Sequence, residues 1–472
     1  MLQAIDATVP TGVLPVLAGL TADSRQVRPG MLYAALPGAK ADGRAFIGDA
    51  VARGAAAVLA PLGTEWPAGV PARPLILHAE PRLALARLAA MQEGVQPDTV
   101  VAVTGTNGKT STAEFLRQIF RAAGRRSASI GTLGVVGPDG AGTPGLTTPD
   151  PVALARTLAE LARDGVEAAA IEASSHGLDQ FRLDGVTLAA GGFTNLTRDH
   201  LDYHGTIEAY RAAKLRLFAE LLPEGAPAVA STALDAETLE ALRAVAARRG
   251  LRLRMTGEGA DLLRAEPHAR GQVLHLLSGR TVELPVSGRF QADNALMAAV
   301  LAEAVGVADA IGLLPGLSGV RGRMELVAAP NGAAAYVDYA HTPDALERLL
   351  GALRPHTAGR LVLVFGAGGD RDPGKRPLMG AVAARGADVA IVTDDNPRGE
   401  DPALIRAAVL AACPEALEIG DRAAAIAAGL EMLRPGDVLA VAGKGHESGQ
   451  TARGVTVPFD DAEVIRRLVV AP

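Results

Sequence analysis

Hydrophobic and polar positions follow two kinds of pattern along this chain. Short apolar runs rich in β-branched residues, such as residues 99–103, are typical of buried parallel strands. Longer segments carry apolar residues on one helical face, as the segment after Thr110 does with Phe115, Ile119 and Phe120. Because strands and helices alternate in this way, we expect an α/β protein with mostly parallel sheets and right-handed crossovers.

The expected elements fall into three groups, separated by polar or glycine-containing segments at 94–98 and 315–322. We expect strands at 31–36, 55–59, 74–77, 99–103, 168–172, 189–195, 335–338, 361–365, 387–393 and 437–442, and helices at 82–92, 151–164, 293–305, 343–354 and 402–411. The grouping predicts a smaller N-terminal α/β domain (1–95), a central domain with a P-loop-type, mostly parallel sheet (96–320), and a C-terminal, Rossmann-like doubly wound domain (321–472).

Composition supports this layered architecture. The 472 residues are enough for about three domains, and 49% hydrophobic with 3% aromatic residues indicates a core of Ala, Leu and Val. The net charge of −6 argues against a general nucleic-acid binder, and one cysteine, Cys413, excludes an intramolecular disulfide. Met1–Asp6 lacks a basic region followed by an apolar run, and no long uncharged apolar segment occurs. We therefore expect a cytoplasmic protein without a signal peptide or membrane span.

A phosphate-binding motif follows the 99–103 strand. Gly105-Thr-Asn-Gly-Lys-Thr110 lies between that strand and a helix, where backbone N–H groups and the helix dipole favour an anion. Lys109 would reach the outer phosphates, and the Thr110 hydroxyl would bind Mg²⁺. The motif is shorter than G-x-x-x-x-G-K-[ST], whose first glycine falls at Val103. The alternative is a tight strand-to-helix turn with a surface lysine, but the order of the elements favours a nucleotide site.

Two further polar motifs follow strands of the central domain. Glu172 lies in Ile171-Glu-Ala-Ser-Ser-His-Gly177, and His200 lies in the motif that begins at Asn195. Ligands of open α/β sheets bind beyond the carboxyl ends of strands, so a carboxylate and an imidazole near the phosphates suit Mg²⁺. Taken singly, Glu172 could be a helix cap and His200 a loop histidine. From its pattern alone, Lys214 is a helical lysine on a solvated face.

In the C-terminal domain, three polar motifs each follow a predicted strand, at 366–372, 394–398 and 443–447. They should meet at one sheet edge. The edge would display Arg371, Lys375, Asn396, Arg398 and Glu447. Arginines bind carboxylates in a bidentate manner and a glutamate binds an ammonium, so the site fits a small zwitterion. The alternative is a set of glycine turns with ordinary surface ion pairs.

These motifs resemble those of the Mur ligase family over nearly the whole chain. The matching motifs are Asp23-Ser-Arg25, Gly105–Thr110, Thr147-Thr-Pro149, Glu172–His176, Asp199-His200, Lys214, Asn294, Gly322-Arg-Met-Glu325, Asp338-Tyr-Ala-His341, Asp394–Arg398 and Gly443–Glu447. Within the family, the resemblance is to the ligases that add meso-2,6-diaminopimelate to UDP-N-acetylmuramoyl-L-alanyl-D-glutamate during peptidoglycan synthesis. The L-lysine-adding ligases are the main alternative within the family.

The resemblance implies roles for individual residues. Catalysis would use Lys109, Glu172, His200 and Lys214. Mg²⁺ would be held by Thr110, Glu172, His200 and a carbamylated Lys214. ATP would be bound by Gly105, Thr106, Asn107, Gly108, Lys109, Thr110, Ser111, Asn294, Arg323, Asp338 and His341. The nucleotide-sugar dipeptide would be bound by Ser24, Thr147, Thr148, Ser174, Gln180 and Arg182. Diaminopimelate would be bound by Arg371, Asp395, Asn396, Pro397, Arg398, Gly443 and Glu447. Ala39-Lys-Ala41 stands where the family often has more hydrogen-bonding side chains around the uracil.

The implied reaction is an ATP-dependent amide ligation through an acyl phosphate, carried out by a monomer on small-molecule substrates. A plain P-loop ATPase or kinase would need only the first motif. A folate polyglutamate synthetase shares the ligase chemistry, but the N-terminal domain and Asn396-Pro-Arg398 fit it poorly. A non-enzymatic binding module would leave Lys109, Glu172 and His200 without a joint purpose.

Overall fold

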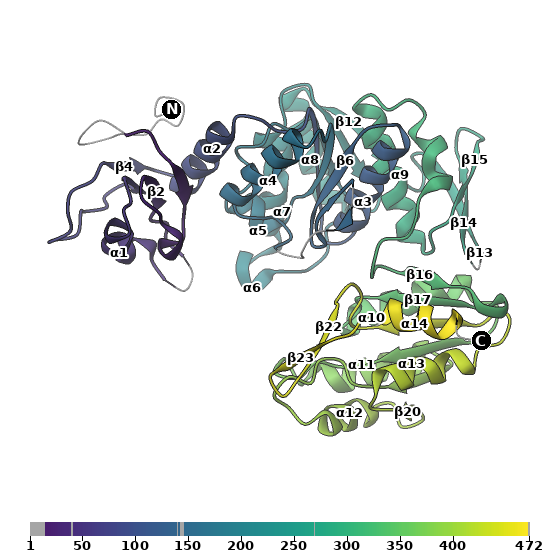
Figure 1. The fold of residues 1–472 in the computed structure, drawn as a ribbon. Coiled ribbons are helices and arrows are strands. Elements are labelled where there is room, and N and C mark those ends of the chain that lie inside the picture. The colour runs from purple at the N-terminus through teal and green to yellow at the C-terminus, as the bar shows by residue number, and fades with distance from the viewer. Residues whose placement is uncertain (1–14, 39–40, 139, 142–145, 269, 471–472) are drawn as a thin grey trace. The chain divides into compact units, whose positions relative to one another are not determined.

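The computed structural model describes residues 15–38, 41–138, 140–141, 146–268 and 270–470. The expectations for Met1–Asp6 and for Ala39-Lys40 lie outside the described residues. The fold is mixed α/β with mostly parallel sheets (Figure 1), as the alternating pattern predicts. Contacts divide the chain into two compact units. The first runs to Arg254 and includes Leu301–Val307; the second comprises Met255–Val300 and the chain from Ala308 onward.

The first unit begins with a four-stranded parallel sheet. Its strands, in spatial order, are β1 (Gly19–Thr21), β2 (Met31–Ala34), β3 (Ala57–Pro61) and β4 (Leu75–His78), and its helices are α1 (Ile47–Ala52) and α2 (Pro81–Glu93). The strands β2, β3 and β4 and the α2 helix lie where the hydrophobic pattern predicts them, whereas β1 was not predicted. Gly94 ends α2 in a left-handed conformation, with φ of 74°, so the chain turns at the start of the predicted 94–98 linker.

An eight-stranded sheet forms the rest of the first unit. Its spatial order is β12 (Arg252–Thr256), β11 (Pro227–Ser231), β10 (Ala190–Phe193), β5 (Thr99–Thr104), β9 (Ala168–Glu172), β6 (Ser127–Gly131), β7 (Gly134–Gly137) and β8 (Gly140–Ala141). Its helices are α3 (Lys109–Ala122), α4 (Pro151–Arg163), α5 (Ser175–Asp179), α6 (Leu201–His204), α7 (Ile207–Arg216) and α8 (Ala236–Arg249). Strand β5 lies between β10 and β9 and is parallel to both. The loop after β5 therefore opens at the carboxyl edge, as a P-loop does.

The second unit contains a three-stranded and a six-stranded sheet. The small antiparallel sheet comprises β13 (Leu262–His268), β14 (Gly271–Leu276) and β15 (Thr281–Leu284). The six-stranded sheet has the order β16 (Glu325–Ala328), β17 (Ala334–Asp338), β21 (Val438–Ala442), β18 (Leu361–Phe365), β19 (Val389–Val392) and β20 (Leu417–Glu418), in which β16 pairs antiparallel and the others parallel. The further elements are α9 (Arg289–Ala304), α10 (Pro343–Leu353), α11 (Lys375–Gly386), α12 (Pro402–Leu410), α13 (Arg422–Glu431), α14 (Asp461–Val470) and the hairpin β22 (Gly449–Ala452) with β23 (Val455–Pro458).

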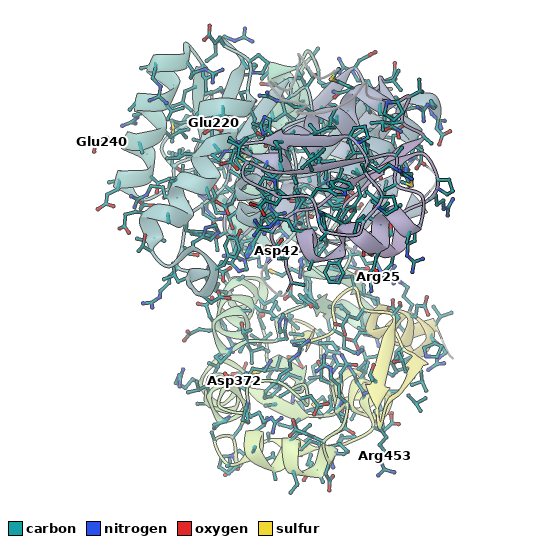
Figure 2. All side chains as sticks on the ribbon, turned by 90° about the vertical axis from the view of Figure 1, so that its left-hand side faces the viewer. Arg25, Asp42, Glu220, Glu240, Asp372 and Arg453 are labelled. Atoms are coloured by element: carbon teal, nitrogen blue, oxygen red, sulfur yellow. The ribbon has the colours of Figure 1, made fainter. Side chains whose placement is uncertain are left out.

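Alternate residues of the six-stranded sheet build two cores, one on each face. Leu363 and its same-face neighbours pack with apolar residues of α10, α11 and α12, whereas Val364 and its neighbours pack with α13 and α14. Helices thus cover both faces, which is the doubly wound arrangement that the near-continuous apolar strands predict. Charged side chains such as Glu240 on α8 and Arg453 at the β22–β23 turn lie on the surface (Figure 2). Among the described residues, no helix combines the length and apolarity needed to cross a bilayer.

Candidate active site

The loop after β5 has backbone geometry that requires glycine. Gly105 has φ of 144°, and a Cβ there would lie 1.9 Å from the Thr194 hydroxyl oxygen. Gly108, with φ of 86°, is the N-cap of α3. The Lys109 Nζ donates to the backbone carbonyls of Gly105 at 2.9 Å and Thr106 at 2.8 Å. The lysine thus lies against the loop that the sequence assigns to phosphate, and Ser111 is buried in the first turn of α3.

Residues after β10 hold this loop in place. The Asn107 backbone N–H donates to Asn195 Oδ1 at 2.9 Å, and the Thr194 hydroxyl donates to the Asn107 carbonyl at 2.6 Å. The Thr197 N–H donates to Thr106 Oγ1 at 2.9 Å. Sequence reasoning missed this support. The available signal was the pair Thr194-Asn195 at the end of the predicted 189–195 strand.

Glu172 lies directly opposite the start of α3. Its carboxylate accepts hydrogen bonds from the Thr110 hydroxyl at 3.0 Å, the Thr132 N–H at 2.8 Å and the Thr132 hydroxyl at 3.3 Å. The side chain is 2% exposed, and its position depends on Gly131, where a Cβ would lie 2.0 Å from Glu172 Oε1. The structure therefore brings together two of the residues assigned to Mg²⁺, a hydroxyl and a carboxylate, which are ligand types that the ion prefers.

Lys214 is buried, so the expectation from its pattern alone, a solvated helical lysine, is wrong. It is 1% exposed, its Nζ donates to the Gly105 carbonyl at 2.7 Å, and it lies over the Tyr210 ring at 4.5 Å. Burial lowers the pKa of Lys214 well below its usual range, and the Lys109 charge lowers it further. A helical pattern could not reveal this, because Lys214 is covered by a loop distant in sequence.

His200 begins α6 in a left-handed conformation, with φ of 51°. Its backbone N–H donates to Asp199 Oδ1 at 2.8 Å, and its ring lies edge-on to His176, with the centroids 4.9 Å apart. Tyr203 also packs on His176, at 4.1 Å between centroids. Within the described chain, no group of three or more His, Cys, Asp or Glu side chains forms a metal site. The Mg²⁺ set that the sequence predicts combines two such side chains, Glu172 and His200, with the Thr110 hydroxyl and Lys214.

The residues assigned to the muramoyl dipeptide, apart from Ser24, form one hydrogen-bonded chain. The Thr148 hydroxyl contacts the Ser174 hydroxyl at 2.9 Å, and Arg182 donates to the Thr148 carbonyl and to Gln180 Oε1, both at 2.7 Å. Thr147 joins through Thr132, with 3.1 Å between hydroxyls, and Thr132 in turn bonds Glu172, whose carbonyl accepts from the Thr148 hydroxyl at 2.7 Å. Ser24 lies elsewhere, in a 3-10 turn capped by Asp23 beside the four-stranded sheet.

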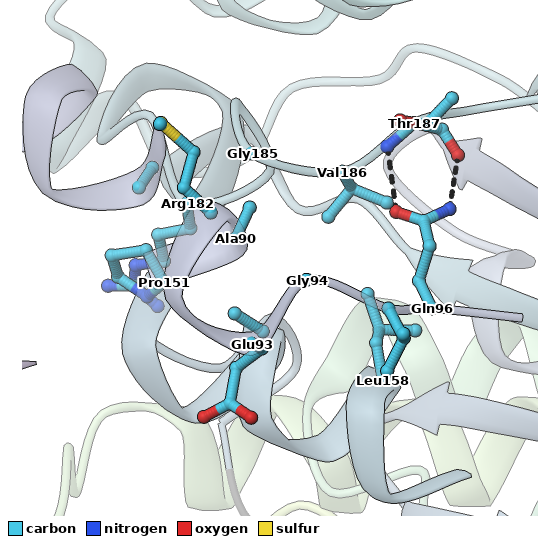
Figure 3. A pocket seen from close by; sticks show the side chains of 14 residues that line it. Ala90, Glu93, Gly94, Gln96, Pro151, Leu158, Arg182, Gly185, Val186 and Thr187 are labelled. Carbon is cyan, nitrogen blue, oxygen red and sulfur yellow. Dashed lines mark hydrogen bonds between the residues drawn. The ribbon is translucent and has the colours of Figure 1, made fainter. Parts of the chain in front are cut away.

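Arg182 also lines a pocket of about 340 Å³ in the first unit (Figure 3). Gln96 closes one side of this pocket through two hydrogen bonds to the Thr187 backbone, at 2.8 Å and 3.0 Å. Its other walls are mainly apolar, from α2 and α4.

In the second unit, the residues assigned to the nucleotide lie near the end of β17. Asp338 accepts from the backbone N–H groups of Met324 at 2.7 Å and Ala340 at 2.8 Å, and burial raises its pKa although Arg323 opposes the shift. Arg323 lies over the Tyr339 ring at 4.9 Å, and the His341 ring packs against that ring at 4.6 Å.

Asn294 approaches the same region through α9. Its Nδ2 donates to Gln291 Oε1 at 3.0 Å, and the Gln291 Nε2 donates to the Arg323 carbonyl at 3.4 Å. The structure therefore connects Asn294 with Arg323 by one intermediate side chain, which the sequence pattern did not indicate.

The three motifs after β18, β19 and β21 meet at one edge of the six-stranded sheet, as predicted. Arg398 Nη1 donates to the Gly369 carbonyl at 2.7 Å, and a Cβ at Gly369 would lie 1.9 Å from the Pro397 carbonyl oxygen. Asn396 Nδ2 donates to Glu447 Oε2 at 2.9 Å. The residues assigned to the amino acid thus come from three loops that contact one another.

The remaining members of that set border the same edge. Asp395 is buried beside Gly443, whose Cβ would lie 2.5 Å from Asp395 Oδ2. Arg371 is exposed, and its charge, with that of Arg398, acts on Lys375 nearby. Burial lowers the pKa of Lys375, whose Nζ donates to the His341 carbonyl at 2.9 Å. Cationic and anionic side chains therefore both border this edge.

The comparison with known families agrees with this arrangement. Residues 16–92 match the model described as Mur ligase family, catalytic domain; residues 103–302 match the Mur ligase middle domain; and residues 322–445 match the Mur ligase, glutamate ligase domain. These matches cover most of the chain, which belongs to the Mur ligase family and is a ligase.

The relatives are more specific. The chain is 55% identical to the UDP-N-acetylmuramoyl-L-alanyl-D-glutamate–2,6-diaminopimelate ligase of Caulobacter vibrioides, with 97% of each chain covered. It is 53% identical to the ligase of the same name from Mesorhizobium japonicum, with 96% of this chain and 97% of that one covered. A solved structure of a ligase with this name aligns with a TM-score of 0.71 at 35% identity, covering 96% of this chain and 95% of that one. A Mycobacterium tuberculosis folylpolyglutamate synthase shares the fold, with a TM-score of 0.60 at 20% identity over 77% of this chain and 91% of that one.

Proposed function

We propose that this protein is an ATP-dependent ligase that adds meso-2,6-diaminopimelate to UDP-N-acetylmuramoyl-L-alanyl-D-glutamate in peptidoglycan synthesis. Relatives named for this reaction match it over nearly their whole length. The choice of diaminopimelate rests on the edge of the six-stranded sheet where Arg398, Asn396 and Glu447 lie together. A site with a cation on one side and an anion on the other binds an amino acid that carries a carboxylate and an ammonium.

The ATP phosphates bind at the 105–111 loop. The α3 N-terminus supplies N–H groups and positive potential, and Lys109 turns from the loop carbonyls toward the outer phosphates. Thr110, Glu172 and His200, with Lys214 as a carbamate, would hold Mg²⁺. The hydroxyl–carboxylate contact at 3.0 Å supports that donor set. The ion would supply charge neutralisation at the phosphates.

The chain's own groups then support two displacements. The D-glutamate side-chain carboxylate attacks the ATP γ-phosphorus, ADP leaves, and an acyl phosphate forms. Lys109 neutralises the charge that moves with the phosphoryl group. The uncharged amine of diaminopimelate attacks the acyl carbon, and the tetrahedral intermediate collapses to amide and phosphate. Thr148, Ser174 and Arg182 orient the dipeptide, so that the amine reaches the acyl carbon before water does.

Arg398 provides the selectivity for diaminopimelate over L-lysine, which lacks the distal carboxylate. The bond from Arg398 Nη1 to the Gly369 carbonyl orients the guanidinium, and Pro397 limits the loop that carries it. Bound L-lysine would leave the partly buried Arg398 guanidinium without a carboxylate partner. Losing one charge-assisted pair of this kind costs on the order of 2–5 kcal/mol, or tens- to thousands-fold in kcat/KM.

The test is phosphate release from ATP and UDP-N-acetylmuramoyl-L-alanyl-D-glutamate with diaminopimelate, L-lysine or L-glutamate supplied one at a time. We expect strong preference for diaminopimelate, and Arg398→Ala should lose this activity far more than ATP affinity. Arg385→Ala is the matched control, since Arg385 is an exposed arginine of the same unit whose ion pair with Glu347 is 3.8 Å long. Equal kcat/KM for lysine and diaminopimelate in the unmutated enzyme would refute this role of Arg398.

The proposal extends to organisation and location. We propose a monomer that acts on small molecules in the cytoplasm, with domains at 1–95, 96–320 and 321–472. The family matches at 16–92, 103–302 and 322–445 support these domain limits.

A further inference from the structure

A fully buried lysine lies behind the site for the amino acid. Lys444 is the second residue of the 443–447 motif, directly after β21, and its side chain is 0% exposed. No substrate atom can reach a side chain that solvent does not reach. A buried ammonium is costly unless its hydrogen bonds are satisfied, so its partners identify its role.

The first partner is Asn396. Lys444 Nζ donates to Asn396 Oδ1 at 3.0 Å, and the Thr451 backbone N–H donates to the same oxygen at 2.9 Å. Only the carbonyl oxygen of an amide can accept two such bonds. The amide is therefore held in one orientation, with its Nδ2 facing Glu447 Oε2 at 2.9 Å.

The second partner is Glu447 itself. Its Oε2 accepts from Asn396 Nδ2 and lies 3.4 Å from Lys444 Nζ, while its side chain is 35% exposed. In the part of the chain that the structure describes, the side-chain contacts of Glu447 all involve Oε2. One carboxylate oxygen is thus anchored to the protein, and Oε1 is the atom that can accept from a substrate ammonium.

We propose that Lys444 is a positioning residue that sets the affinity of the site for the ammonium end of the incoming amino acid. It does so by fixing Asn396 and, through it and directly, the Glu447 carboxylate. This inference rests on the proposed function, because it assumes that an amino acid binds at this edge. It assigns Lys444 no contact with substrate, only the orientation of two groups that have one.

A purely structural role makes a different prediction. A lysine that only stabilised the fold would, when replaced, lower the melting temperature and the amount of active enzyme without changing any KM. A positioning role changes the KM for diaminopimelate and leaves the KM for ATP and for the UDP substrate near their original values. A positioning role also makes the change in the KM for diaminopimelate depend on the presence of Asn396.

The experiment compares Lys444→Met, which keeps the length of the side chain without its charge, with Lys444→Gln, which keeps a donor for Asn396 Oδ1. Steady-state phosphate release gives the three KM values, and thermal melting reports folding. We expect Lys444→Met to raise the KM for diaminopimelate roughly 10- to 100-fold, as the loss of a hydrogen bond to a charged group does. Lys444→Gln should restore part of the loss and provides the test if the Met variant does not fold.

A double-mutant cycle with Asn396→Ala completes the test. If Lys444 acts through Asn396, Lys444→Met should add little to the KM effect of Asn396→Ala. An unchanged KM for diaminopimelate in both Lys444 variants, or equal changes in all three KM values, would overturn the inference. An unmutated enzyme that releases no phosphate with diaminopimelate would instead overturn the proposed function, so the two failures are distinguishable.

Discussion

A methyl group added to Gly131 should disable the enzyme without altering any functional group. In Gly131→Ala, the new Cβ would lie 2.0 Å from Glu172 Oε1 and 2.4 Å from Glu172 Cδ. Gly131 has no positive φ, so the backbone accepts alanine and the carboxylate must move. Ordinary contact begins at 3.4 Å, so the required shift is roughly 1.4 Å.

That shift determines the expected loss of activity. The Thr110 hydroxyl is 3.0 Å from Glu172 Oε2, so a displacement above 1 Å breaks this contact and moves the carboxylate away from the start of α3. Misplacing a positioned group by about 1 Å can cost about 100-fold in rate. Overpacking a buried site also costs about 1–3 kcal/mol of stability. We therefore expect kcat to fall about 100-fold in a protein that still folds.

The assay is the kcat of phosphate release, with thermal melting measured in parallel. Gly351→Ala is the matched control, because a Cβ at Gly351 in α10 meets nothing within 4 Å. That substitution should leave kcat unchanged and raise stability by about 0.5–1 kcal/mol. A folded Gly131→Ala enzyme with unmutated kcat would refute the role given to Glu172.

Three further predictions concern titratable groups. Lys109→Ala should lower kcat by about 10²–10³-fold with little change in melting temperature, since its Nζ donates to loop carbonyls that water can solvate in its place. Unmutated activity in the folded variant would exclude this ATP site. Removing CO₂ should lower kcat and bicarbonate should restore it, because the lowered pKa of Lys214 leaves a neutral amine able to form a carbamate. Short carboxylic acids should rescue the activity of Lys214→Ala. A plain Lys214 ammonium in a crystal with nucleotide and Mg²⁺ would contradict the carbamate. Burial lowers the pKa of His446 from 6.5 to about 4. Between these two values the unfolded chain binds the imidazole proton more tightly than the folded chain does, so stability falls as pH is lowered through that range. His446→Gln should flatten that part of a profile of unfolding free energy against pH, and an unchanged slope would contradict this role of His446.

Many elements of the fold could be predicted from local patterns, although β1, β6, β7 and β8 were not. The 99–103 strand, the helix after Thr110 and the strands before the three C-terminal motifs lie within a few residues of their expected positions, because each buries a regular apolar stripe. The convergence of those motifs followed from parallel strands sharing one carboxyl edge. Local sequence did not decide the order of β11 to β15, since these strands are short and β12, β13 and β15 are partly exposed.

Burial of individual polar residues was the main failure of sequence reasoning. Lys214 follows a pattern that a solvated side chain would also fit, yet a loop distant in sequence buries it. Thr194 and Asn195 were expected only as the end of the 189–195 strand, whereas they follow β10 and hold the loop after β5. In each case the deciding contact is tertiary, and periodicity carries no information about it.

The central place of β5 has a consequence for how the chain is made. Its two neighbours, β9 and β10, are synthesised long after it, since Val101 pairs with Ala170 on one side and Ala190 on the other. Until both have left the ribosome, an apolar strand ending in the nucleotide loop has unpaired edges that can join other chains. We expect nascent chains stalled before residue 190 to need a chaperone and to bind no nucleotide, however complete their own motif is. The nucleotide loop at 105–111 can therefore take up its folded structure only after β9 and β10 have been synthesised.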